Sequence, residues 1–293
     1  MMKRLIALLM LLAMLLPAAA EEEDDWLFVD LSGDMVVSYN AVKWDFPVDI
    51  ADMEPDLIYM VNKSMFLDED FTPKNLVKMK SVKLDKEGNN TNGGVRQVDG
   101  TWQLREECAE ALVELCDAAR AEGHELYLKS GYRSYYKQAV MYENRVKKYG
   151  YDDGWVTKPG ASDHQTGLGV DVLNYEWTKK DGMNEKFAYE AEAKWMAEHC
   201  WEYGFVIRYM EDKEEITKIN YEPWHLRYVG KEVAQYMHEK HYCLEEFTQE
   251  WQQYLDEYAQ NGGDFEQLIK DRARLVPTVI GYSEDGEEEV SIY

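Results

Sequence analysis

Positive charge is scarce in this chain of 293 residues, which carries 32 lysines and arginines against 57 aspartates and glutamates. Binding to nucleic acid or to an anionic membrane surface needs clustered basic side chains that neutralise phosphates. The formal net charge of -25 therefore argues against both kinds of partner. An excess of acidic side chains instead favours solubility.

Long hydrophobic runs are also missing, apart from one near the N-terminus. Residues 5–16 are apolar, Lys3 and Arg4 precede them, and residues 17–20 read PAAA. The run is too short to cross a hydrocarbon core, which needs about 20 residues. The pattern predicts a cleaved signal peptide over residues 1–20, an exported protein and no stable membrane span after cleavage. No cysteine follows the run, so a lipid anchor is not indicated.

Cysteine and histidine are both rare. The four cysteines are Cys108, Cys116, Cys200 and Cys243. An even number in an exported chain permits disulfides without requiring them, so their state stays open at this point. A histidine-based site has only six candidates, which are His124, His164, His199, His225, His238 and His241.

The composition divides the chain behind the signal peptide into three parts. Residues 21–56 are acidic and contain prolines, and we interpret them as an N-terminal extension. Residues 57–243 carry alternating helix and strand patterns and are expected to form the main domain. Residues 244–293 read as an amphipathic helix followed by an acidic tail.

The main domain is predicted to belong to the α+β class. Apolar residues recur three and four positions apart over 103–122, 134–149 and around 195–203, which indicates helices. Ser134 is the expected N-cap of the second helix, and Gly150 is expected to end it. Strand patterns cover 124–133, 167–173, 205–209 and 225–230. This order predicts a small, largely antiparallel sheet with helices packed on it.

His164 and Asp171 are candidate residues of one site because of the strand pattern between them. Alternate side chains of a strand point to opposite faces, which places Asp171 on the same face as Gly169. Gly169 has no side chain, so a loop that carries His164 can fold back into the space it leaves. Alone, the pair is a weak signal, and an ordinary loop histidine beside a strand-end aspartate explains it better.

A second segment, EPWH at 222–225, favours a shared site over that ordinary explanation. Glu222 and His225 would point to opposite faces of a regular strand, but Pro223 cannot donate a ladder hydrogen bond and favours a departure from the pleat. Both side chains can then face one site at the sheet. Two neutral imidazoles and one carboxylate form a three-ligand zinc set with a fourth position for water, and another carboxylate is free to take the proton of that water.

Several segments carry a resemblance to a known family. They are VNKSMFL and FTPKNLV within 61–77, SGYRS at 130–134 followed by Gln138, SDHQTGLGVDV at 162–172 and EPWHLRYVG at 222–230. In this order they resemble the VanY-type D-alanyl-D-alanine carboxypeptidases, zinc enzymes that trim bacterial cell-wall stem peptides. The family also includes L,D-carboxypeptidases and D,D-dipeptidases. The resemblance covers about residues 57–240 and leaves both terminal segments outside it.

The resemblance implies a role for each matching residue. His164, Asp171 and His225 are expected to bind zinc, and Glu222 is expected to be the catalytic base. Arg133 matches the family arginine that contacts the carbonyl or carboxylate of the substrate.

The substrate pocket is expected to include Gln138 and Ser162, which match polar family positions, together with Trp224. The implied activity is removal of the C-terminal D-alanine from peptidoglycan stem peptides, outside the cell or at the bacterial cell wall. An L,D-carboxypeptidase or a D,D-dipeptidase on the same site is an alternative. A wall-binding module that holds zinc without chemistry is another, and its mark would be a missing base, whereas Glu222 is present.

Overall fold

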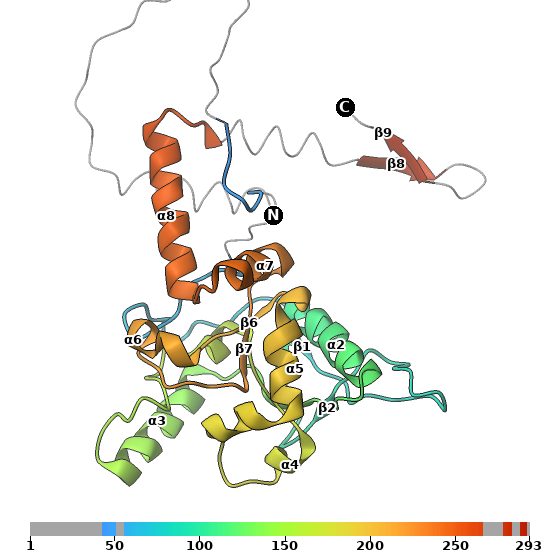
Figure 1. Cartoon of the computed structure of the whole chain (residues 1–293), viewed down its shortest axis with the longest axis vertical. Helices are drawn as coiled ribbons and strands as arrows, with labels where there is room; N and C mark the ends of the chain where they lie inside the picture. The colour runs from blue at the N-terminus through green and yellow to red at the C-terminus, as the bar shows by residue number, and fades with distance from the viewer. Residues whose placement is uncertain (1–42, 51–55, 266–277, 283–287, 292–293) are drawn as a thin grey trace, which may run out of the picture. The chain divides into compact units, whose positions relative to one another are not determined.

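The computed structural model describes residues 43–50, 56–265, 278–282 and 288–291 (Figure 1). The predicted signal peptide and most of the predicted N-terminal extension lie outside these residues. The chain divides into two compact units. The larger one comprises residues 52–250, and the smaller one comprises the remaining N- and C-terminal residues. Within the described part of the chain, no helix is long and apolar enough to span a membrane.

A five-stranded sheet forms the centre of the larger unit. Its spatial order is β2 (Arg96–Gln97), β4 (Tyr127–Ser130), β5 (Gly169–Leu173), β7 (His225–Tyr228) and β6 (Phe205–Ile207). The β2–β4 pair is parallel, and the other three pairs are antiparallel. A separate antiparallel pair joins β1 (Leu76–Lys78) to β3 (Gln103–Arg105). The prediction of an α+β domain with a largely antiparallel sheet is confirmed.

The first long helix, α2, spans Glu106–Ala121 and is shorter than the pattern predicts. Residues 103–105 pair with β1 instead, and the amide of Arg105 donates to the carbonyl of Gly167 at 3.0 Å. Tertiary hydrogen bonds thus take over the backbone groups that a helix would have used. The helix buries Leu112 and Leu115 against the sheet residues Val170, Val172 and Leu226, all of them wholly buried. Each such side chain contributes about 1.5–3 kcal/mol.

The second long helix, α3, spans Tyr135–Tyr149 as predicted. The Ser134 side chain accepts from the amide of Lys137, and Gly150 ends the helix with a φ of 85°. The only buried residue of α3 is Gln138, so this helix contributes little to the core. In Figure 1 it lies well away from α2 and α5.

The remaining helices follow the chain towards the C-terminus. Two short helices are α4 (Tyr175–Thr178) and α6 (Glu214–Thr217), and the longer ones are α5 (Ala191–His199), α7 (Lys231–Lys240) and α8 (Leu244–Gln260). Four 3-10 turns are η1 (Asp163–Thr166), η2 (Glu185–Tyr189), η3 (Cys200–Tyr203) and η4 (Glu211–Lys213). All four cysteines are buried free thiols.

The smaller unit includes the second half of α8, where the amphipathic pattern predicts a helix. Trp44 packs edge-on against Trp251, Tyr254 and Tyr258, with ring centroids 4.9–5.5 Å apart. The predicted tail contains β8 (Thr278–Tyr282), which pairs in antiparallel fashion with β9 (Glu288–Ser291).

Candidate active site and metal centre

His164 lies in the turn η1, between α3 and β5, and its position depends on Gly169. A Cβ atom added at Gly169 would lie 2.9 Å from the carbonyl carbon of Asp163 and 3.0 Å from the amide nitrogen of His164. Atoms do not approach that closely without a shift of the backbone. The missing side chain therefore lets the loop fold back against β5, as the sequence predicts.

Asp171 and His225 come from neighbouring strands, and their Cα atoms are register partners in the β5–β7 pair. His225 Nδ1 lies 3.0 Å from Asp171 Oδ1, and His164 Nε2 lies 3.2 Å from Asp171 Oδ2. One ligand atom from each of the three buried side chains lies within 4.8 Å of the others. Ligand atoms of a tetrahedral zinc ion with bonds of about 2.1 Å are about 3.4 Å apart, so the donor set and its spacing fit such an ion.

The environment of the His164 imidazole suits it to bind a metal ion. His164 Nδ1 donates to the carbonyl of Gly131 at 2.8 Å, which leaves the lone pair of Nε2 directed at Asp171. Burial, together with the positive charge of Arg133, lowers the pKa of His164 to about 4, so the ring is neutral at neutral pH. Burial alone would raise the pKa of Asp171, but His164 and His225 hold it below its ordinary value.

Glu222 lies beside the three ligands and outside the strand. The amide of His225 donates to the carbonyl of Glu222 at 3.1 Å, which makes the turn that Pro223 predicts. Glu222 Oε2 is 3.8 Å from His225 Nδ1. Burial raises the pKa of Glu222 well above its usual range, and the negative charge of Asp171 acts in the same direction. A carboxyl group of raised pKa next to a metal site is suited to take up and release a proton.

A cavity of about 610 Å³ opens onto this cluster, and every predicted site residue lines it. The predicted residues are Arg133, Gln138, Ser162, His164, Asp171, Glu222, Trp224 and His225. The Trp224 ring stacks on Trp155 with centroids 6.1 Å apart and planes 14° apart. Trp155 and Tyr209 also line the cavity and were not predicted, because no chemical motif in the sequence surrounds them.

Arg133 forms no ion pair with any residue that the structure describes. Its guanidinium Nη1 lies 3.0 Å from the thioether sulfur of Met141, and its buried Nε has no hydrogen-bond partner among the described residues. The same part of the structure offers it no ion pair. Burial lowers the pKa of Arg133, while the negative charges of Asp171 and Glu222 oppose that effect. The guanidinium is therefore available to an anionic group that enters the cavity.

Gln138 lines the cavity and keeps one buried acceptor without a partner among the described residues. Its Nε2 donates to the carbonyl oxygen and the hydroxyl oxygen of Thr157, at 2.7 and 3.2 Å. Its Oε1 is buried without a partner among the described residues. Both amide donors are thus used within the protein, and the free atom suits an N–H group of a substrate better than a carboxylate. Ser162 is buried in the same wall.

Comparison with known proteins places these residues in a family. The family model described as D-alanyl-D-alanine carboxypeptidase, VanY, matches residues 101–231. A bifunctional D-Ala-D-Ala dipeptidase and D-Ala-D-Ala carboxypeptidase, VanXYC of Enterococcus gallinarum, is 37% identical over 146 residues, which cover 49% of this chain and 76% of that protein. The chain belongs to the VanY family of D-alanyl-D-alanine carboxypeptidases.

Two further relatives show how far the likeness to VanY-family proteins extends. The Bacillus subtilis (strain 168) protein YodJ is 45% identical over 148 residues, and the match covers 49% of this chain and 53% of YodJ. The chain thus spans about half the length of that relative. The structure of the LdcB LD-carboxypeptidase has a TM-score of 0.55 and 38% identity, and the match covers 67% of this chain and 87% of that chain.

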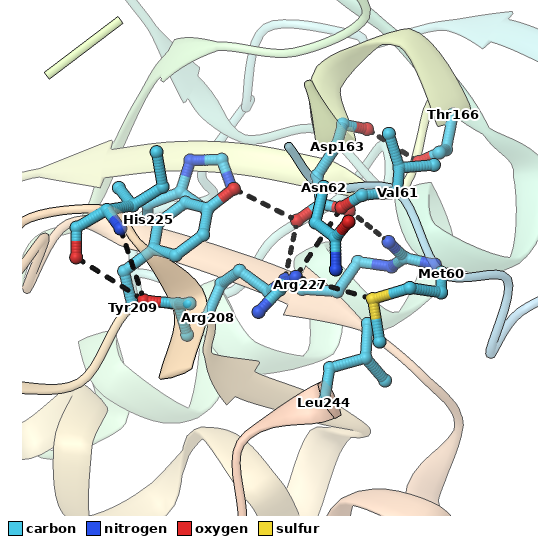
Figure 2. Close-up of polar contacts among 12 residues, drawn as sticks. Met60, Val61, Asn62, Asp163, Thr166, Arg208, Tyr209, His225, Arg227 and Leu244 are labelled. Carbon is cyan, nitrogen blue, oxygen red and sulfur yellow. Dashed lines mark hydrogen bonds and ion pairs between the residues drawn. The ribbon is translucent and has the colours of Figure 1, made fainter. Parts of the chain in front are cut away.

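The VanY match contains all eight predicted site residues, and it also contains buried charged residues that were not predicted. Arg208 and Arg227 are wholly buried and form ion pairs with Asp163, next to the metal cluster (Figure 2). Their signal in the sequence is an arginine inside each of two short apolar strand segments, FVIRY and HLRYVG. A charged residue in such a segment is rarely buried without a specific partner.

Proposed function

We propose that this chain is a zinc-dependent carboxypeptidase that removes the C-terminal D-alanine from peptidoglycan stem pentapeptides. The observation that carries the proposal is the unpaired guanidinium of Arg133 in the same cavity as the cluster of His164, Asp171 and His225. A partly buried cation without an anionic partner is desolvated with little compensation, so an entering anion is favoured there. The free carboxylate at the end of a peptide, or the oxyanion formed during hydrolysis, is such a group.

His164, Asp171 and His225 would hold the zinc ion through one ring nitrogen each and a carboxylate oxygen. When bound in such a site, zinc acts as a Lewis acid and lowers the pKa of water to about 7. Three protein ligands leave a coordination position open, which is the arrangement of catalytic rather than structural zinc sites.

Glu222 would take the proton of the attacking water as the water oxygen bonds to the carbonyl carbon of the last peptide bond. It would then pass that proton to the amine of the leaving D-alanine as the carbon–nitrogen bond breaks. Its position beside His225, at 3.8 Å, leaves its carboxylate free of the ligand set. Its raised pKa favours uptake of the proton from the water.

Arg133 and Gln138 would orient the peptide end. Arg133 can form two parallel hydrogen bonds to a carboxylate, or stabilise the negative oxygen of the tetrahedral intermediate. The free Oε1 of Gln138 can accept from a peptide N–H. The stacked rings of Trp155 and Trp224 supply an apolar wall for the alanine methyl groups.

A second candidate is an L,D-carboxypeptidase that acts on tetrapeptides. The likeness to the structure of the LdcB LD-carboxypeptidase favours it, because that match covers most of that chain. The metal, the base and the arginine would have the same roles in both activities. The difference between them lies in the configuration of the residue before the cleaved bond.

Mass spectrometry of stem peptides incubated with the purified chain distinguishes these activities. We expect the pentapeptide to lose one residue, the tetrapeptide to stay intact, and a chelator to stop the reaction. Cleavage of the tetrapeptide alone would replace the first proposal by the second. Cleavage of the free dipeptide D-Ala-D-Ala into two alanines would indicate a dipeptidase. Intact peptides in the presence of zinc-loaded protein would indicate a binding module.

We also propose that the protein is exported and acts at or outside the cell wall. The basic start, the apolar run and the small residues before position 21 support export. N-terminal sequencing of the secreted protein should begin at Glu21. Retention of the whole chain inside the cells would contradict this proposal.

A further inference from the structure

Four charged side chains form a buried network next to the predicted zinc ligands His164, Asp171 and His225. Arg208 Nε donates to Asp163 Oδ2 at 2.8 Å, and Arg227 Nη1 donates to Asp163 Oδ1. The two other nitrogens of Arg208 donate to both carboxylate oxygens of Glu245, at 2.7 and 2.8 Å. Figure 2 shows how Asp163 lies between the arginines and the ring of Tyr209.

The network is electrically balanced and closed to water. The side chains of Asp163, Arg208 and Arg227 are 0% exposed, and that of Glu245 is 14% exposed. Two carboxylates thus balance two guanidinium groups. The remaining donors of Arg227 are also satisfied, because its Nη2 donates to the carbonyls of Leu57 and Tyr59 at 2.9 Å each.

A balanced buried network of this kind does not by itself explain stability. Desolvation of the ions offsets much of their attraction, and apolar side chains of similar size often stabilise a protein as well or better. What such a network supplies is geometry, because a guanidinium donates hydrogen bonds to carboxylates only in a planar, directed arrangement. The role of the network therefore depends on which atoms it positions.

The network contacts the segments that carry the predicted zinc ligands at several points. Asp163 directly precedes His164 in η1, and Arg227 is on the same strand as His225. The amide of Arg208 donates to the carbonyl of His225 at 3.1 Å. The Tyr209 hydroxyl donates to Asp163 Oδ2 at 3.5 Å, and its ring lies 5.1 Å from that of His225.

His164 depends on this attachment more than the other two ligands do. Asp171 and His225 are held by the β5–β7 ladder, whereas His164 lies in a short 3-10 turn. On one side the backbone of the turn packs directly against Gly169, and on the other side the carboxylate of Asp163 pairs with two fully buried arginines. The peptide between Asp163 and His164 is clamped between these two contacts.

We propose that Asp163 is a positioning residue of the metal site, which holds the His164 backbone in register with Asp171 and His225 through its ion pairs with Arg208 and Arg227. The inference rests on the zinc site of the proposed function. It adds a residue that does not touch metal or substrate. It also gives the segment around Leu57, outside the matched residues 101–231, a part in supporting the site through Arg227.

The test is the zinc affinity of Asp163→Asn, measured by competition with a chelator, together with the absorption spectrum of the cobalt(II)-loaded protein. Asparagine keeps the size of the side chain but cannot pair with both arginines. We expect zinc to bind about 10- to 100-fold more weakly, as is typical when an outer partner of a ligand is lost. The cobalt spectrum should change because the ligand geometry changes.

Glu245→Gln is the matched control. It removes one negative charge from the same arginine while Asp163 keeps both of its partners. We expect lower thermal stability with unchanged zinc affinity and cobalt spectrum. Wild-type zinc affinity and spectrum in Asp163→Asn would overturn the proposal, and so would an equal loss of zinc affinity in Glu245→Gln.

A double variant covers the case in which Asp163→Asn does not fold. Asp163→Asn with Arg227→Gln removes one charge of each sign, so the network stays balanced, and zinc binding should be weakened as in the single variant. Wild-type affinity in the double variant contradicts the proposal. If neither variant folds while Glu245→Gln does, the network is a folding element and the proposal is wrong. Zinc affinity is measured without substrate, so a wild-type chain that binds zinc but cleaves no peptide would disprove only the proposed function.

Discussion

Asp171 and His225 face each other across two antiparallel strands, as register partners whose side-chain atoms Oδ1 and Nδ1 lie 3.0 Å apart. The register of β5 against β7 therefore decides whether the metal site exists. A slip by one residue would turn Asp171 to the opposite face of the sheet. His164, which the sheet does not hold, has to be brought to this pair by packing.

Gly169→Ala should weaken both the fold and the metal site. The added Cβ would lie within 3.0 Å of backbone atoms of residues 163 and 164, so the turn that carries His164 has to move. We expect a destabilisation of about 1–3 kcal/mol, as for other overpacked positions, and weaker zinc binding in a chelator titration. Gly88→Ala is the control for zinc binding: its φ of 91° strains an alanine and lowers stability, but a Cβ there meets nothing within 4 Å, so zinc affinity should not change. A wild-type zinc affinity for Gly169→Ala would show that the turn adapts.

Zinc should stabilise the wild-type protein and not His164→Ala. A ligand that binds only the folded state stabilises it by about 4 kcal/mol when its concentration exceeds Kd a thousandfold. The measurement is the thermal unfolding temperature with a chelator and with added zinc. His238→Ala, which changes an exposed histidine, should keep the full zinc-dependent shift. An equal shift in His164→Ala would remove this histidine from the ligand set.

Glu222→Gln should keep the metal and lose hydrolysis. The amide resembles the carboxyl group in shape but cannot accept the proton of water, so kcat should fall by about 10²- to 10⁴-fold. Zinc content and kcat are measured on the same sample. Glu215→Gln changes a side chain that is 99% exposed and serves as the control. Near-normal turnover by zinc-loaded Glu222→Gln would contradict the assigned role.

Arg133→Lys should impair the use of substrate although the positive charge is kept. A lysine cannot offer two parallel donors to a carboxylate, and charged hydrogen bonds of this kind contribute about 1.5–3 kcal/mol. We expect kcat/KM to fall on the order of 10- to 100-fold. Arg120→Lys is the control, since Arg120 pairs with Asp117 and Glu125 on the surface of α2 and does not line the cavity. Equal kcat/KM values for the two variants would refute a specific role of Arg133.

The stability of the metal-free protein should fall between about pH 6.5 and pH 4. Burial lowers the pKa of His164 to about 4 from its ordinary value of 6.5, so in this range the unfolded chain binds a proton that the folded chain does not. The contribution is fully present above pH 6.5 and is lost as the pH falls towards 4, by about 3 kcal/mol in total. Urea unfolding with a chelator measures it. His164→Gln should show a shallower pH dependence than the wild type and His238→Gln, and equal slopes would contradict the prediction.

Local sequence patterns predicted those elements whose hydrogen bonds are local. The second helix begins and ends as expected because Ser134 and Gly150 supply its cap and its left-handed end within the segment itself. The start of α2 was predicted wrongly, because residues 103–105 pair with a strand that the local pattern does not contain. The same limit explains the orientation of Gln138, which depends on Thr157 in a different segment.

The candidate site was predictable in its chemistry. Histidine, aspartate and glutamate at their spacings, the gap at Gly169 and the turn at Pro223 all follow from side-chain type and strand alternation. The residues that support the site were not predictable, because Asp163, Arg208 and Arg227 show their pairing only when three separate segments meet.

The sequence by itself determined which groups can bind a metal, which carboxylate stays free and which segments form four of the five strands of the sheet, since these depend on residue type and on short-range periodicity. Only the tertiary structure decided that Arg133 meets no anionic partner among the described residues, that Thr157 takes the donors of the Gln138 amide and that two arginines hold the residue before His164. These properties depend on which distant side chains share a buried space, and burial is a property of the folded chain rather than of any segment of it.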